Sequence, residues 1–179
     1  MQKIILASGN RGKLAEIQSL LAPLKLTVAQ QSELDVPEAD ETGATFVENA
    51  LLKARNAAAH TGLPALADDS GLAVDALDGA PGIYSARYAG SQANDAENNK
   101  KLLAALDGLP ENQRGAQFHC CVVFLRSATD PTPLVCQGVW PGRILTAPRG
   151  VAGFGYDPLF WAPDQNMSAA ELPKDIKNQ

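Results

Sequence analysis

Two adjacent carboxylates, Asp68 and Asp69, follow an apolar stretch of this 179-residue chain. A buried carboxylate is costly unless positive charge lies beside it. Magnesium would supply that charge, since it binds one or two carboxylates together with the oxygens of a phosphorylated substrate. The same residues also suit a turn that ends a hairpin, with Gly71 leading the chain away into a second strand. This run alone leaves a metal site and a structural turn equally open.

A second candidate is the polar run Ser8–Lys13, which lies between an apolar segment and a helical pattern. Backbone N–H groups at the start of a helix carry partial positive charge and can bind phosphate. Gly9 permits close approach of a phosphate, Asn10 offers an amide donor and Lys13 a full charge. The run matches neither common phosphate-loop motif. An ordinary strand-to-helix turn with a surface lysine therefore stays open.

A third candidate is the run Gly153–Pro158, in which two glycines enclose Phe154. This pattern indicates a backbone that approaches something flat, and a base stacked on an aromatic ring gains about 1–3 kcal/mol. A tight turn with Phe154 and Tyr156 in the core is the alternative. Glu41 and Lys53, taken alone, are typical surface residues.

Length and composition favour one globular domain with an adequate core. The hydrophobic fraction is 45% and the mean hydropathy −0.12. A net charge of −5 argues against general nucleic-acid binding. The sequence shows no signal peptide or membrane-spanning run, so no membrane association is expected. The cysteines lack C-x-x-C spacing, and Cys120 and Cys121 in an apolar run are expected to be buried thiols; the expected compartment is the cytoplasm.

The elements that must position these residues alternate between strands and helices in the first half of the chain. Thr45 and Glu48 form a capping-box pattern, and Gly62 suits the end of the helix that they open. The predicted elements of this half are a strand over 3–7, a helix ending at Pro23, a strand over 24–29, a loop over 31–43, a helix over 45–60, and strands before Asp68 and over 72–76.

Strands dominate the second half. The expected elements are an ordered loop over 78–91, a helix capped by Asn94 and ending near Leu106, paired strands over 118–125 and 133–139, a glycine-rich loop over 150–158 and a last helix opening at Ser168. Early alternation followed by strands predicts an α/β domain with a mixed sheet.

Taken together, five runs resemble one family in order and spacing: Ser8–Lys13, Thr45–Ala54, Leu66–Leu72, Pro81–Tyr88 and Gly153–Pro158. They are similar to the bacterial members of the inosine triphosphate pyrophosphatases, and the resemblance runs from residue 3 to the end. It implies a single α/β domain over residues 1–179, with a central elongated mixed sheet, flanking helices and two lobes around a substrate cleft. It also implies a homodimer.

The implied activity is hydrolysis of ITP, dITP and XTP to the monophosphate and pyrophosphate with Mg²⁺, which removes these nucleotides from the pool. By the same resemblance, the catalytic residues would be Asp69, Lys53 and Asp68, with Asp69 as the general base. Glu41 and Asp69 would hold the metal with Asp68 close by, and Lys53 would also bind the triphosphate. The remaining implied contacts to the nucleoside triphosphate come from Ser8, Gly9, Asn10, Arg11, Gly12, Lys13, Ser70, Phe154, Gly155, Tyr156, Asp157 and Lys177.

The chain departs from the family pattern in one respect. Family members continue into a Ser-His-Arg-Gly run and a closing helix, and that His-Arg pair helps to recognise the 6-oxo group of the base. This chain ends at Gln179 without the run. One alternative is therefore a nucleotide-binding protein with impaired catalysis. Another is a pyrophosphatase that acts on thymidine or uridine triphosphates.

Overall fold

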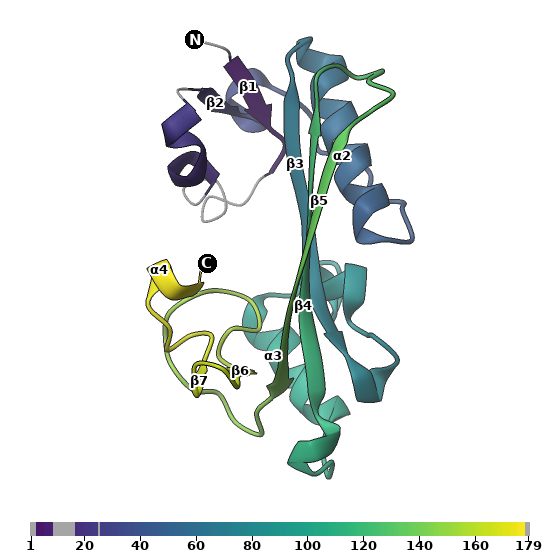
Figure 1. Cartoon of the computed structure of the whole chain (residues 1–179). Helices are drawn as coiled ribbons and strands as arrows, with labels where there is room; N and C mark the ends of the chain where they lie inside the picture. Colours follow the sequence, from purple (N-terminus) through teal and green to yellow (C-terminus); the bar gives the residue numbers. More distant parts are fainter. Residues whose placement is uncertain (1–2, 9–16, 25, 178–179) are drawn as a thin grey trace. The chain divides into compact units, whose positions relative to one another are not determined.

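The structure, a computed structural model, describes residues 3–8, 17–24 and 26–177. Its strands form a seven-stranded mixed sheet in the order β2 (Thr27–Gln30), β1 (Lys3–Leu6), β3 (Ala65–Val74), β4 (Gly115–Leu125), β5 (Leu134–Ile144), β6 (Phe160–Ala162) and β7 (Met167–Ser168). Helices flank the strands (Figure 1). The α/β class with a mixed sheet and flanking helices is confirmed, whereas two lobes around a cleft stay an expectation.

The helices include α2 (Phe46–Thr61), α3 (Asp95–Ala105) and α4 (Lys174–Lys177), and residues 17–21 are also helical. Short 3₁₀ turns lie at Ala22–Leu24, Gln31–Leu34, Asp75–Leu77, Gly82–Arg87 and Glu111–Gln113. Within the described ranges, every helix is too short or too polar to cross a bilayer.

The chain divides into two compact units. Unit 1 comprises Met1–Asp69 and Cys120–Gly138, and unit 2 comprises Ser70–His119 and Val139–Gln179. Strands β3, β4 and β5 each contribute residues to both units. These three continuous strands, rather than a linker, therefore join the two units.

Unit 1 is built on α2 and the strands beside it. β1 pairs in parallel with β2 and with β3, and Figure 1 shows α2 alongside the unit 1 part of β3. Ala50, Ala54 and Ala57 of α2 are fully buried against a core that includes Ile5 and Val123. Because alanine has a small side chain, the helix can pack closely on the sheet.

The predicted boundaries of α2 are confirmed by its caps. The Thr45 side chain accepts a hydrogen bond from the Glu48 N–H at 3.2 Å. The Glu48 carboxylate accepts from the Ala44 N–H at 2.8 Å and the Thr45 hydroxyl at 2.9 Å, rather than from the Thr45 N–H. Gly62 ends the helix in the left-handed conformation, with a φ of 68°.

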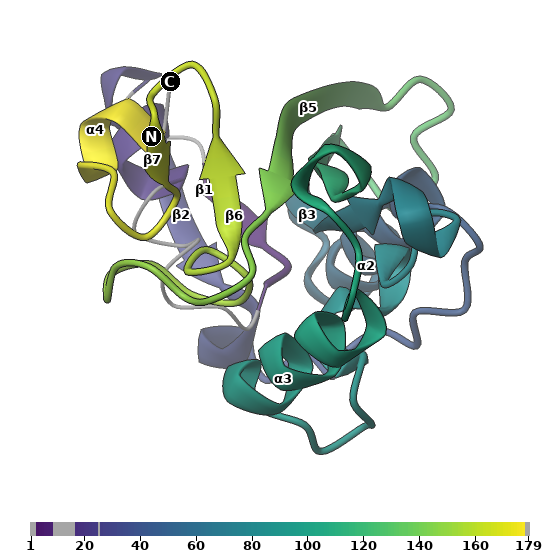
Figure 2. The ribbon, with the colours of Figure 1, turned by 90° about the horizontal axis from the view of Figure 1, so that it is seen from below.

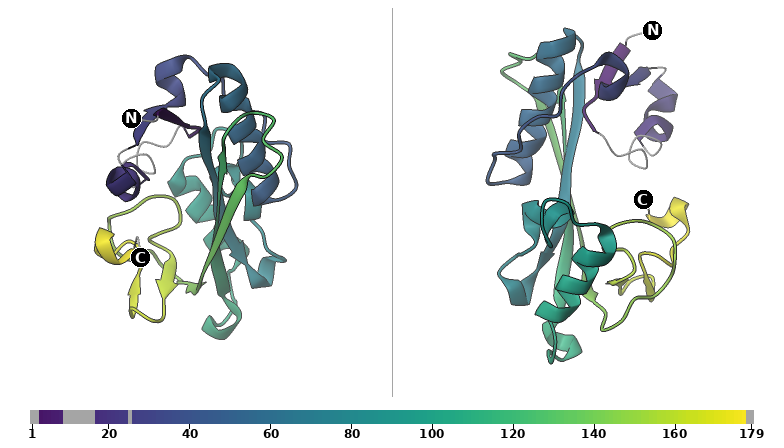
Figure 3. Two further views of the ribbon diagram at one scale, coloured as in Figure 1. Left: turned by 45° about the horizontal axis from the view of Figure 1, so that its top comes forward. Right: turned by 180° about the vertical axis from the view of Figure 1, so that it is seen from behind.

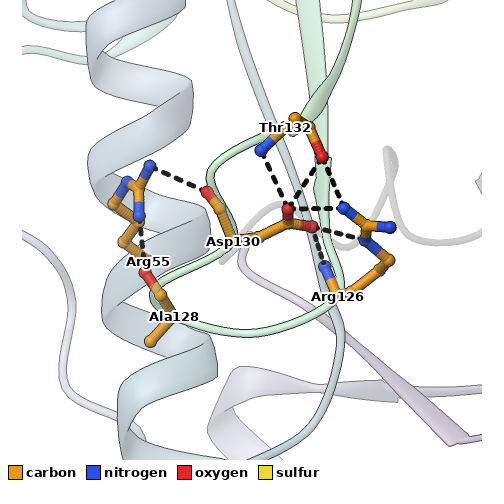
Figure 4. Close-up of polar contacts among 5 residues, drawn as sticks. All are labelled: Arg55, Arg126, Ala128, Asp130 and Thr132. Carbon is orange, nitrogen blue, oxygen red and sulfur yellow. Dashed lines mark hydrogen bonds and ion pairs between the residues drawn. The ribbon is translucent and has the colours of Figure 1, made fainter.

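A network of polar contacts in unit 1 fixes the turn between β4 and β5 (Figure 4). Arg126 donates to both carboxylate oxygens of Asp130, at 2.8 and 2.7 Å, and the Thr132 N–H donates to the same carboxylate at 2.9 Å. Arg55 of α2 donates to the Ala128 carbonyl at 2.5 Å and to the Asp130 carbonyl at 3.3 Å. Helix α2 and the turn are thus tied together.

Unit 2 has its own apolar core around α3. Leu72, Leu102, Leu106 and Phe160 are fully buried in it. Asn94 and Glu97 form the reciprocal cap of α3, so its predicted start is confirmed. Figure 2 shows α3 as a regular helix and β6 beside β7, and Figure 3 shows that loops make up most of the segment after β5.

A buried arginine, Arg114, also stabilises unit 2. It is 3% exposed and donates to the carbonyls of Ile144, Leu106 and Leu145 at 2.8, 2.7 and 2.9 Å. Burial lowers its pKa from the ordinary value, and the charges of Asp107 and Glu111 oppose that change. Two of these bonds hold the start of β4 against the end of β5, and the bond to Leu106 ties it to the end of α3.

Several predicted elements are wrong in detail. The expected turn at Gly71 is absent, because β3 runs unbroken from Ala65 to Val74. Residues on both sides of Gly71 are buried, Ala67 in the core of unit 1 and Leu72 in that of unit 2. An extended strand satisfies both cores, so Asp68 and Asp69 lie within a strand and not at its end.

Three further predictions are wrong: the start of the second strand, the helix at Ser168 and the burial of Cys120. The strand predicted over 24–29 starts at Thr27, since a 3₁₀ turn precedes it. The helix predicted at Ser168 is instead a turn after β7, in which Glu171 accepts from the Ser168 N–H at 2.9 Å. Cys120 is exposed and Cys121 buried, because neighbouring strand residues face opposite sides.

Candidate functional site

Lys53 lies at the centre of the candidate catalytic cluster in unit 1. Its Nζ contacts Asp69 Oδ1 at 2.8 Å and Glu41 Oε1 at 3.1 Å. Three elements supply these side chains: α2, β3 and the loop before α2. One ammonium group thus lies between two carboxylates that are far apart in the sequence.

Asn49 supports this cluster from the preceding turn of α2. Residues four apart on a helix lie on one face, so Asn49 and Lys53 point the same way. The Asn49 amide makes a long 3.5 Å contact to Asp69 Oδ2, and its oxygen accepts from the Gly43 N–H at 2.9 Å. Sequence reasoning gave Asn49 no role, although its spacing from Lys53 was a usable signal.

Gly43 is required where the Glu41 loop meets α2. A Cβ at this position would lie 2.6 Å from Glu48 Cβ and 2.7 Å from Asn49 Oδ1. Both distances are too short for a real side chain. The absence of a side chain therefore lets the loop lie close enough to bring Glu41 to Lys53.

Burial tunes the ionisation of the cluster. Burial raises the pKa of the Asp69 carboxyl above its ordinary value, Glu41 adds to the rise, and the hydrogen bond and charge of Lys53 oppose it. For Lys53, burial alone would lower the pKa, but the hydrogen bond to Asp69 and the charges of Asp69 and Glu41 raise it. A carboxyl with a raised pKa is a better proton acceptor near neutral pH.

Asp68 and Asp69 are both buried, at 5% and 8% exposure. Neighbouring residues of a strand direct their side chains to opposite faces of the sheet. Asp69 contacts α2, so Asp68 lies on the other face. Ser70 follows as the first residue of unit 2. A catalytic role for Asp68 stays a prediction, and the geometry favours Asp69 as the carboxylate that works with Lys53.

Glu41 and Asp69 have donor groups that suit magnesium. Within the described ranges, no group of three or more His, Cys, Asp or Glu side chains is arranged to hold a metal ion. Glu41 and Asp69 nevertheless both present a carboxylate oxygen to the Lys53 Nζ, so the two carboxylates lie close to each other. Mg²⁺ completes such a pair with substrate phosphate oxygens. The residues fit the ion, and their assignment as ligands stays a prediction.

The candidate base-recognition residues lie in unit 2, in the loop before β6. Phe154 is 44% exposed. Its N–H donates to Asp157 Oδ2 at 2.9 Å, and Lys177 Nζ contacts the same oxygen at 2.5 Å. The Lys177 ammonium also lies 4.5 Å from the centre of the Phe154 ring. The structure therefore brings three predicted substrate contacts together: Phe154, Asp157 and Lys177.

Backbone shape and a buried tyrosine fix this loop. Gly153 has a φ of +79°, and a Cβ there would collide with the Asp157 carboxylate. The buried Tyr156 hydroxyl donates to the Ser85 carbonyl at 2.8 Å, and burial raises the Tyr156 pKa. Tyr156 therefore anchors the loop in the core, while Phe154 extends outward.

The predicted phosphate turn falls mostly outside the described part of the chain. Ser8, which follows β1, is partly buried. Gly9, Asn10, Arg11, Gly12 and Lys13 lie in the range 9–16, outside the described residues. Their predicted contacts with the substrate stay predictions.

Comparison with known proteins decides which family carries these features. The model of the Ham1 family matches residues 4–179. The chain belongs to the Ham1 family. The dITP/XTP pyrophosphatase of Yersinia pseudotuberculosis serotype I is 63% identical to this Ham1 chain over 178 residues, which are 99% of this chain and 90% of the relative. The dITP/XTP pyrophosphatase of Vibrio cholerae serotype O1 is 59% identical over 100% of this chain and 90% of the relative.

Solved Ham1 structures share the fold. The HAM1 protein from Coxiella burnetii matches with a TM-score of 0.94 at 53% identity, over 99% of this chain and 90% of that one. The Staphylococcus aureus Ham1 protein matches with a TM-score of 0.88 at 39% identity and the same coverage. The resemblance indicated by the five sequence runs is therefore confirmed for this Ham1 chain.

Proposed function

We propose that this chain hydrolyses the non-standard purine nucleoside triphosphates ITP, dITP and XTP to the nucleoside monophosphate and pyrophosphate, and so removes them from the nucleotide pool. The observation that carries the proposal is the partly buried Glu41–Lys53–Asp69 arrangement in a chain 63% identical to a named dITP/XTP pyrophosphatase. The proposal assigns the phosphate chemistry to unit 1 and base recognition to unit 2.

In the proposed reaction water attacks the α-phosphorus, the bond from that phosphorus to the bridging oxygen breaks, and pyrophosphate leaves. Asp69 accepts the proton of the water, a role that its burial-raised pKa supports. Lys53 orients the Asp69 carboxylate through the 2.8 Å contact and neutralises charge that develops on the phosphates. Ser8 and the residues from Gly9 to Lys13 bind the phosphate chain.

Mg²⁺ is the proposed cofactor, and Glu41 and Asp69 would hold it. When bound, the ion supplies charge neutralisation and lowers the pKa of coordinated water. The support is the oxygen-only donor set of two carboxylates around one positive group.

Phe154 is the proposed stacking surface for the purine, with Ser70, Gly155, Tyr156, Asp157 and Lys177 completing substrate recognition. The exposed Phe154 ring and its adjacent Lys177 ammonium support this assignment. An oxo group on the base can accept hydrogen bonds from donor groups of the protein. An amino group at the same position would leave those donors unpaired. A site of this kind rejects the amino analogue strongly.

The test measures pyrophosphate and orthophosphate separately after incubation with dITP and Mg²⁺. Pyrophosphate is the expected direct product, and orthophosphate would refute the proposed cleavage site. Asp69→Asn is expected to lower turnover by about 10²–10⁴ with the fold retained. Asp164→Asn, at an exposed turn position, is the matched control and is expected to keep wild-type turnover.

The alternative of a nucleotide-binding protein without catalysis is disfavoured, because relatives named as pyrophosphatases match 99% and 100% of this chain. It predicts dITP binding by calorimetry with no hydrolysis at any metal concentration. A thymidine or uridine triphosphate substrate would appear as a preference in a nucleotide panel.

The proposal includes a single-domain enzyme, a homodimer and a cytoplasmic location without a nucleic-acid or membrane partner. These features rest on the family resemblance and on the net charge of −5. Light scattering after size-exclusion chromatography is expected to give twice the 18.9 kDa of the chain. A monomeric mass at micromolar concentration would refute the dimer.

A further inference from the structure

Three successive peptide groups around Phe154 are each held by a different side chain. The Phe154 N–H donates to Asp157 at 2.9 Å. The Gly155 N–H, in the next peptide group, donates to Asp95 Oδ2 at 2.7 Å. The Gly155 carbonyl, in the third, accepts from the Asn99 amide at 2.9 Å. The backbone on both sides of the Phe154 side chain is therefore fixed.

Two of these three side chains come from the same helix. Asp95 and Asn99 lie four residues apart at the start of α3, so they lie on one helix face. They bond the N–H and the C=O of the same residue, Gly155. Helix α3 is itself fixed, because Asn94 and Glu97 cap it reciprocally and Leu102 is fully buried.

The folding of unit 2 does not by itself require these hydrogen bonds to the backbone beside Phe154. The loop is already anchored by the buried Tyr156 and the fully buried Leu159. The Phe154 ring remains 44% exposed, with the Lys177 ammonium 4.5 Å from its centre. A fixed backbone that carries a partly exposed aromatic ring is what a preorganised stacking surface requires, since binding then costs less ordering of the loop.

We infer that Asp95 and Asn99 are positioning residues for base recognition: they hold Gly155 so that the Phe154 ring is already in place to stack on the purine. This inference rests on the proposed function. It assigns to α3 a role in substrate affinity that is separate from the phosphate chemistry of Glu41, Lys53 and Asp69.

The first test measures kcat and KM for dITP in Asp95→Ala and Asn99→Ala. Each variant is expected to raise KM about tenfold while kcat changes less than about twofold, because ground-state and transition-state binding are weakened alike. Lys100→Ala, at an exposed position of the same helix, is the matched control and is expected to keep both constants. Unchanged KM in both variants would overturn the inference.

Two further variants separate positioning from a merely structural role. Asp95→Asn keeps an oxygen that can accept from the Gly155 N–H, so it is expected to restore KM to within about twofold of wild type. In a Phe154→Ala background, Asp95→Ala is expected to cause no additional rise in KM, since interacting residues give non-additive effects. Additive losses in that background would overturn the inference.

Thermal unfolding of each variant accompanies the kinetics. If Asn99→Ala does not fold, the Asp95 variants carry the test, because Asp95 is exposed. Absence of pyrophosphate release by the wild-type protein would refute the proposed function and the inference with it. Wild-type release combined with unaffected variants would refute the inference alone.

Discussion

At the scale of single residues, Lys53 balances two carboxylates that would otherwise repel each other. Its side chain is 17% exposed, and those of Glu41 and Asp69 are 27% and 11% exposed. Removing the partner of a partly buried charge leaves that charge uncompensated. Lys53 therefore stabilises unit 1, and in the proposed reaction we expect it to contribute to catalysis as well.

We expect Lys53→Met to lower kcat for dITP by about 10²–10³, the usual effect of removing one electrostatic stabiliser. We also expect a lower melting temperature, because Glu41 and Asp69 lose their shared partner. Steady-state kinetics and thermal unfolding check both effects. Lys100→Met at an exposed site is the control, and equal losses in both variants would contradict the assignment.

The close approach at Gly43 gives a second residue-scale prediction. A Cβ in Gly43→Ala would lie 2.6 Å from Glu48 Cβ, so we expect a loss of about 1–3 kcal/mol of stability and a lower turnover as Glu41 is displaced. Chemical denaturation measures the first effect. Gly138→Ala, where a Cβ meets nothing within 4 Å, is expected to change stability by less than about 0.5 kcal/mol.

Residue-scale prediction from sequence succeeded where the relevant physics is local. The caps at Thr45 and Asn94 depend on groups three residues away, so the spacing alone indicates them. The contact of Lys53 with Asp69 depends on how α2 packs on β3. No local pattern encodes that packing, and only the family resemblance brought the two residues together.

At the scale of elements, the turn between β4 and β5 depends on one carboxylate. Hydrogen bonds from the Arg126 guanidinium, together with backbone N–H groups of Arg126 and Thr132, hold the pKa of Asp130 well below its usual range. Because the folded-state pKa is depressed, Asp130 stabilises the protein above the unfolded-state pKa of about 3.9. That contribution is lost as the pH falls through the lower folded-state value.

We therefore expect Asp130→Asn to lower the melting temperature at neutral pH, and the gap from wild type to shrink below about pH 4. Thermal unfolding between pH 7 and the acid limit of solubility measures the gap. Asp164→Asn at an exposed position is expected to show no such dependence. A gap that stays constant into acid would exclude the carboxylate charge as its cause.

Element boundaries were predictable where a cap or a proline marks them and wrong where tertiary burial decides. A short run of Asp, Ser and Gly is a common turn signal, yet β3 passes through Gly71 because apolar residues on either side are buried in separate cores. At Ser168 the Glu171 carboxylate does accept from the Ser168 N–H. Pro173 then separates that turn from α4.

At the scale of the whole molecule, three strands pass from one core to the other. Strands β3, β4 and β5 have residues in both units. If the core of one unit is lost, these strands lose packing there, and the same strands also form part of the other core. We expect the two units to unfold together. The sequence indicated one domain without a linker, and only the family resemblance implied two lobes within it.

Val123→Ala tests this coupling. Val123 is fully buried in unit 1, and its truncation should cost about 2 kcal/mol. Both tryptophans of the chain, Trp140 and Trp161, lie in unit 2, so the indole fluorescence transition is expected to shift as much as the circular dichroism transition. Val135→Ala at a site 40% exposed is the control. A fluorescence midpoint unchanged by Val123→Ala would show independent units.

The placement of the sulfur atoms has a practical consequence. Cys120 and Cys136 are exposed while Cys121 is sealed in the interior, and all three belong to the unit that lacks an indole. A maleimide acceptor dye attached to the native surface thiols would receive energy from the tryptophans of the other half. The wild-type protein thus carries its own energy donors and dye attachment points. Energy transfer between them in solution would report whether the two units move when nucleotide binds.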